Sequence, residues 1–137
     1  MGTSILTSVK KIVGLEEDYT AFDPDIIMHI NGTFSTLNQL GIGPEHGFEI
    51  EDAVPVWDAF LGTDPRWNFV KTYVSLKVRL LFDPPSNSFT IDAIKKQLEE
   101  YEWRINLYRE HLAWYDPSTS LSGDVDELNV VLDGGTP

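Results

Sequence analysis

A double proline between two helical patterns constrains the fold of this chain more than any other feature. Residues 70–82 have the apolar content of a buried helix, and Asp83-Pro84-Pro85 ends it because proline lacks an amide donor and restricts the preceding residue. In the segment that follows, apolar residues recur at alternating spacings of three and four, which places them along one face of a helix. These residues are Ile91, Ile94, Leu98, Tyr101, Ile105, Tyr108 and Leu112. The sequence therefore predicts a hairpin of two long antiparallel helices.

Two further helices are predicted upstream of the hairpin. The apolar spacing over residues 4–13 is typical of a short amphipathic helix that ends at Gly14. Asp23 followed by Pro24 has the pattern of an N-cap and a first helical turn, so a second helix is expected from there to Gly41. Shorter pieces are expected at 48–50 (extended) and 55–61 (helical).

Each helix of the hairpin has its own start signal. Asp64 and Pro65 repeat the cap-and-proline pattern, and the apolar positions that follow cover more than one stripe, so this helix is expected at the centre of the bundle. Thr90 is the predicted N-cap of the last helix, with Phe89 and Ile94 as a hydrophobic staple. Oppositely charged pairs four residues apart, Lys95/Glu99, Lys96/Glu100 and Glu100/Arg104, are expected on its outer face.

These patterns predict an all-α fold: a small helical bundle with a long antiparallel helix hairpin and an extended C-terminal tail. We expect one helical domain over residues 1–113 and an acidic tail over residues 114–137, in which the composition changes to small and acidic residues. The start of the chain does not resemble a signal peptide, and no apolar run is long enough to cross a bilayer. A soluble protein without a membrane partner, made and kept in the cytoplasm, is therefore expected.

The net charge of −12 is distributed unevenly along the chain. Lys10 and Lys11 give the start of the chain a charge of +2, residues 12–65 contain eleven acids and no Lys or Arg, residues 66–111 carry +2, and the tail from residue 112 onward carries −5. Unlike surfaces on neighbouring copies can meet, so this layout favours head-to-tail contact between subunits. The alternative is that the acids only solvate the surface.

The sequence has no pattern of reaction chemistry. It has no cysteine, its three histidines (His29, His46 and His111) lie far apart, and neither a phosphate-binding glycine loop nor a nucleophile elbow is present. The basic residues of the centre alternate with acids, which does not favour tight binding to nucleic acid. We therefore expect no catalytic, cofactor-binding or metal site, and no enzyme.

The candidate functional residues are instead aromatic and apolar residues that can contact another chain. Trp103 falls on the face of the last helix opposite the apolar seam, among charged residues. The alternative is that the fold of its own chain covers it, because tryptophan is rarely left exposed. In the tail, Trp114 is a second candidate, and the β-branched stretch with Leu128, Val130 and Leu132 is typical of a short strand that adds to an edge on a partner. An ordinary unpaired terminus is the alternative there.

Several of these motifs are similar to those of one known family. Residues 70–85 (VKTYVSLKVRLLFDPP), 87–89 (NSF) and 98–106 (LEEYEWRIN) resemble the head-tail connector, or neck adaptor, proteins of long-tailed bacteriophages. The similarity continues upstream in the order and spacing of Ile30-Asn31, Phe34, residues 37–41 (LNQLG), Phe48, Trp57 and Phe60-Leu61. The resemblance covers residues 4–110 and leaves the tail unmatched.

The resemblance implies a structural virion protein. Such a subunit is made in the host cytoplasm and assembles in roughly a dozen copies as a ring at the neck, between the portal protein and the stopper or tail-completion protein. DNA passes through the ring without specific binding, which a net-negative protein permits.

Two other functions remain open. The first is an acidic inhibitor that mimics DNA and occupies a nucleic-acid site on a host enzyme, which explains the charge but not the apolar seam. The second is a generic helical scaffold.

Overall fold

The computed structural model describes residues 2–111. Five α-helices and one 3₁₀ helix lie in this range: α1 (Ile5–Ile12), α2 (Asp23–Gln39), α3 (Trp57–Leu61), η1 (Pro65–Trp67), α4 (Asn68–Phe82) and α5 (Ser88–His111). Within it there is no strand, and β-pairing is limited to an isolated antiparallel bridge between Ser4 and Val56. The all-α prediction is confirmed. The domain boundary expected at residue 113 lies outside the described residues.

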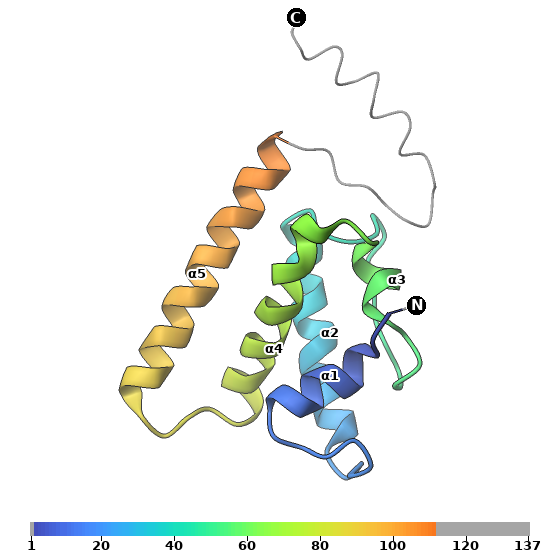
Figure 1. Ribbon diagram of the computed structural model, residues 1–137, viewed down its shortest axis with the longest axis vertical. Coiled ribbons are helices and arrows are strands. Elements are labelled where there is room, and N and C mark those ends of the chain that lie inside the picture. The colour runs from blue at the N-terminus through green and yellow to red at the C-terminus, as the bar shows by residue number, and fades with distance from the viewer. Residues whose placement is uncertain (1, 112–137) are drawn as a thin grey trace, which may run out of the picture.

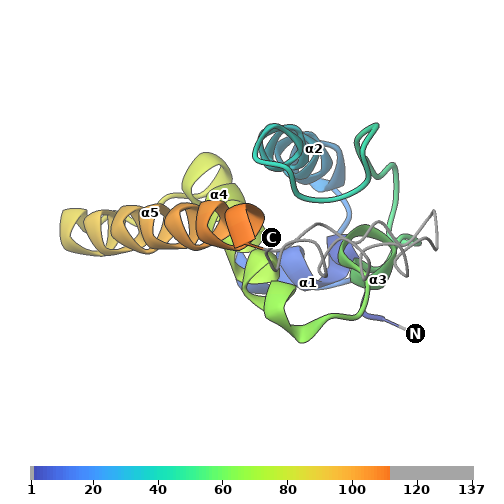
Figure 2. The same ribbon diagram turned by 90° about the horizontal axis from the view of Figure 1, so that it is seen from above.

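Helix α4 is at the centre of the molecule, as its broad apolar surface predicts. It packs against α1, α2 and α5, and four of its side chains, Val70, Tyr73, Val74 and Val78, are fully buried. Helix α5 runs antiparallel to α4 along its outer side (Figure 1). Seen from above, the start of α5 extends well beyond the rest of the fold (Figure 2). The hairpin therefore presents one helix to the core and the other to the exterior.

The apolar seam of α5 packs against α4 of the same chain. Ile94, Leu98 and Ile105 are buried, and the rings of Tyr101 and Tyr108 contact Phe69 at centroid distances of 5.3 and 6.1 Å. The regular spacing of three and four is thus explained by packing within one chain, which leaves the opposite face of α5 exposed in the part that the structure describes. The last seam residue, Leu112, is outside the described part.

Helix α5 begins earlier than predicted. Asn87 is its capping residue, because its Oδ1 accepts hydrogen bonds from the backbone amides of Phe89 (2.7 Å) and Thr90 (3.4 Å). The prediction of Thr90 as N-cap is therefore wrong. The hydrophobic staple is wrong as well: Phe89 lies within the first turn and points outward, with 84% of its surface exposed, while Ile94 is buried.

The start of α2 also differs in detail. Asp23 is the first helical residue rather than the cap, and its carboxylate forms an ion pair with the ammonium group of Lys10 at 2.8 Å. Lys10 is 2% exposed and donates two more hydrogen bonds, to the carbonyl oxygens of Glu17 (2.9 Å) and Tyr19 (2.8 Å). One buried cation therefore joins α1, the following loop and α2. The amphipathic pattern of α1 is otherwise confirmed, except that Ile12 is 50% exposed.

A partly buried hydrogen bond links the two helices of the hairpin. The phenol of Tyr73 donates to Glu102 Oε2 at 2.8 Å, and burial together with this bond raises the pKa of Tyr73 above its usual value of 10.0. Above about pH 10 the unfolded chain releases this proton while the folded chain keeps it, so the stability contributed by the phenol is lost as the pH rises.

We therefore expect the urea midpoint of the protein to fall between pH 9 and pH 11, and the fall to be smaller in Tyr73→Phe, which has no phenol at this position. Below pH 9 the variant should be less stable by about 1 kcal/mol, the contribution of one hydrogen bond. Urea titrations at a series of pH values measure both effects. Equal pH dependence in the two proteins would contradict the assignment.

Candidate interaction surface

The outer face of α5 has exposed side chains in one straight stripe. Phe89, Lys96 and Trp103 are seven residues apart, two helical turns each time, so their side chains lie in line, with Ala93 and Glu100 beside them. Trp103 is 63% exposed. The alternative that its own fold covers it does not hold for the part of the chain that the structure describes. Its role as a contact residue stays a prediction.

The predicted ion pairs along α5 do not form. Among residues 2–111, neither Lys96 nor Glu100 has an ion-pair partner, and the guanidinium of Arg104 lies over the ring of Phe69 at 4.3 Å instead of against Glu100. An arginine over an aromatic ring is stabilised by the negative face of the ring. The charges of the outer stripe are therefore left to solvent or to a partner.

Sequence reasoning missed a second exposed apolar group, at the closed end of the hairpin. Tyr19, Phe22 and Phe82 form a row of edge-to-face aromatic contacts, with centroid distances of 5.8 and 5.4 Å, and Leu81 beside them in the chain is more than half exposed. The signal that could have indicated this group is the clustering of aromatic residues next to the predicted helix ends. Aromatic residues packed inside the core would give the same pattern, so the sequence does not distinguish the two.

The side of the molecule that lies opposite α5 is acidic. An open hollow of about 570 Å³ lies between the first turns of α2 and the segment 49–53. Its lining residues include the apolar Pro24 and Ile27 and the exposed acids Glu49, Glu51 and Asp52. In Figure 1 the segment leading into α3 lies on the far side of the molecule from α5, and Figure 2 shows the same separation.

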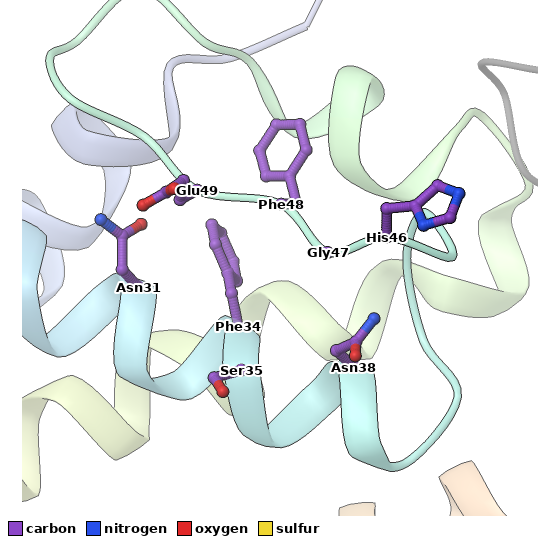
Figure 3. A pocket seen from close by; sticks show the side chains of 8 residues that line it. All are labelled: Asn31, Phe34, Ser35, Asn38, His46, Gly47, Phe48 and Glu49. Carbon is purple, nitrogen blue, oxygen red and sulfur yellow. The ribbon is translucent and has the colours of Figure 1, made fainter.

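The acidic segment is held in place by Asn31 of α2. The Asn31 side-chain amide donates to the carbonyl oxygen of Ile50 (2.9 Å), and its Oδ1 accepts from the Ile50 backbone amide (2.8 Å). One side chain therefore satisfies both backbone groups of Ile50, which a neighbouring strand would otherwise pair. The predicted extended piece at 48–50 therefore has no strand partner. Figure 3 shows Asn31 and Glu49 next to each other at one end of a smaller hollow, with Phe34 facing Phe48.

This smaller hollow, of about 360 Å³, is lined by side chains that stabilise the loop of residues 40–50. The Asn38 amide donates to the carbonyl oxygen of Pro44 (3.2 Å), and the ring of Phe34 contacts that of Phe48 (5.6 Å), so these side chains hold the loop of residues 40–50. His46 is exposed, and Glu49 is the one acidic residue among those that line the hollow with it. The polar groups here stabilise the backbone.

No group of three or more His, Asp or Glu residues placed to hold a metal ion occurs in the described range. His29 lies on α2 and His46 in the following loop, far from one another in the chain as the sequence indicates. Within the same range, no helix is long and apolar enough to cross a membrane.

The fold and its surfaces define a small helical protein with two chemically different faces, the outer stripe of α5 with its exposed aromatic side chains and the acidic hollow. Comparison with protein families gives the class a name. Residues 5–111 match the family model described as phage connector protein, and the chain belongs to that family. No curated protein and no solved structure matches this chain. The other predicted contact residues, Trp114, Leu128, Val130 and Leu132, lie outside the described residues.

Proposed function

We propose that this chain is a structural, non-catalytic virion protein that forms a ring at the phage neck, between the portal protein and the stopper or tail-completion protein. The observation that carries the proposal is the family match over residues 5–111. The two unlike faces support it, because a closed ring is built from heterologous contacts in which one face of each subunit meets a different face of the next.

The charge of the protein agrees with a DNA channel. DNA must slide through a neck without being held, and binding to the duplex is driven mainly by Lys and Arg contacts to phosphates. With a net charge of −12, the protein offers few such contacts and repels the duplex. We propose that DNA passes through the ring without specific binding.

A phage in which this gene carries a nonsense codon tests the role directly. We expect filled heads and free tails to accumulate in a non-suppressing host, and infectious particles to form when the purified protein is added to that lysate. Normal yields of tailed particles without the protein would overturn the proposal.

Trp103→Ala should weaken binding to the portal or to neighbouring copies by about tenfold or more, because a large exposed aromatic side chain is a typical centre of binding energy. Sedimentation of the variant with portal rings measures the effect. Asn106→Ala, an exposed residue on the same helix but off the stripe, is the matched control and should bind as the unmodified protein does. Unchanged binding by Trp103→Ala, with its helicity intact, would refute the role of this residue.

A second candidate function is an acidic inhibitor that mimics DNA. The supporting observation is that residues 12–65 contain no Lys or Arg, with Glu49, Glu51 and Asp52 gathered on one exposed surface. Such an inhibitor would bind a basic host enzyme in a salt-sensitive way and would have no affinity for a portal ring. Pull-down from host extract at low and high salt distinguishes the two functions.

A further inference from the structure

The start of α5 has the chemistry of an inserting element. Phe89 is the most exposed large apolar side chain in the described part of the molecule, at the end of a helix that extends beyond the fold (Figure 2). Lys96 follows two turns later on the same stripe, about 10 Å along the axis, and has no ion pair with any side chain that the structure describes. An exposed aromatic ring with a cation two turns away on the same stripe favours a site that combines apolar and acidic residues.

The hollow between α2 and residues 49–53 is a site of that kind. Pro24 and Ile27 supply apolar lining, and the exposed acids Glu49, Glu51 and Asp52 line it as well. Neither Lys nor Arg occurs among its lining residues, and the carboxylates of Glu49 and Glu51 have no hydrogen bond or ion pair within the described range. Asn31 fixes the position of Ile50, so the hollow is held open by the fold itself.

The two sites lie on opposite sides of one subunit, so they cannot meet within a chain (Figures 1 and 2). We propose that the start of α5 on one copy, through Phe89 and Lys96, docks in the acidic hollow of the next copy, and that this contact joins neighbouring subunits of the ring. The occupant is a second copy of this chain, which is indicated by the exposed ring of Phe89 and by the positive charge of Lys96, complementary to the carboxylates that line the hollow. The proposal rests on the ring function above and adds to it the pair of surfaces in contact.

The expected contact combines an apolar and an ionic part. Burying the ring of Phe89 removes apolar surface from water, and Lys96 meets carboxylates that otherwise repel one another. Loss of either part should weaken association between copies by tenfold or more, and association should weaken as salt is raised.

Two one-sided variants test the head-to-tail arrangement. The first, Phe89→Ser/Lys96→Ala, removes the inserting side and leaves it no charge, and the second, Glu49→Lys/Glu51→Lys, removes the acids of the hollow. Each alone should fail to assemble, whereas an equal mixture should form a 1:1 complex that grows no further, because each partner keeps one intact side. Sedimentation velocity resolves these species. Assembly of either variant alone like the unmodified chain would overturn the proposal.

Matched controls change the same charges elsewhere. Lys95→Ala removes the charge of the neighbouring lysine, which is off the stripe, and Glu16→Lys/Glu17→Lys reverses two exposed acids in the loop after α1. Both should assemble normally. If they fail to the same extent, the effect is one of net charge and the proposed contact is wrong.

Site-specific crosslinking tests the contact in the assembled state. Because the chain has no cysteine, the double variant Ala93→Cys/Ala53→Cys has only the two introduced thiols, one beside the stripe and one in the lining of the hollow, and it keeps Phe89, Lys96 and the acids of the hollow. On portal rings, mild oxidation should give a ladder of covalent multimers, and Lys95→Cys/Glu16→Cys should give none. Assembly of the unmodified chain on the portal without a ladder in the first variant overturns this inference alone. Absence of any assembly by the unmodified chain overturns the ring function and this inference together.

Discussion

Replacing Lys10 with alanine should lower the free energy of unfolding by about 3 kcal/mol, although the residue is charged and lies on a short helix. Its ammonium group is buried and has three partners: the carboxylate of Asp23 and the carbonyl oxygens of Glu17 and Tyr19. The substitution leaves all three without the donor. The Asp23 side chain is 24% exposed and partly hydrated, so we do not expect the largest costs known for broken buried pairs.

Urea denaturation of Lys10→Ala beside Lys11→Ala measures the effect. Lys11 is the next residue on the same helix and is exposed, so its replacement should change stability by less than about 0.5 kcal/mol. Similar losses in the two variants would show that the three contacts of Lys10 do not stabilise the fold.

Gly43→Ala should destabilise the protein by about 3 kcal/mol, and Gly47→Ala by only about 1 kcal/mol. Both glycines have positive φ, +91° and +96°, so the strain of a left-handed backbone is similar in the two variants. A Cβ at Gly43 would lie 2.6 Å from the ring of Phe60, whereas a Cβ at Gly47 has no atom within 4 Å. The difference between the variants therefore isolates the clash.

The clash at Gly43 is not easily relieved, because the ring of Phe60 is buried and packs between Phe34 (4.3 Å) and Phe48 (5.2 Å). Thermal and urea unfolding of both variants give the comparison. Equal destabilisation would mean that the ring moves aside, and that packing around it is looser than the structure shows.

The hairpin was predictable because its signals are local. A double proline between two apolar patterns ends α4 at Phe82 whatever the rest of the chain does, and the spacing of Ile94, Leu98 and Ile105 specifies the face of α5 that packs on α4. The start of α5 was predicted wrongly because two residues near it can act as the N-cap. Asn87 and Thr90 can each satisfy free amides, and capping by Asn87 turns Phe89 away from the core.

Only part of the candidate interaction surface could be predicted from the sequence. Trp103 follows from the helical period, because a residue opposite a buried seam is exposed. The acidic hollow joins residues 23–31 with residues 49–53, which are distant in sequence and meet only because Asn31 binds Ile50. The role of Lys10 was hidden for the same reason: its partners follow from the path of the loop after α1, which no periodic pattern specifies.

The most direct test of the account is the mass of portal rings, from the phage genome that encodes this chain, after mixing with the purified protein. Mass photometry should show the portal mass rising to a plateau that corresponds to about one copy of this chain per portal subunit. A portal mass that stays unchanged at saturating, folded protein, with empty rings and with DNA-filled heads alike, would contradict a connector at the neck.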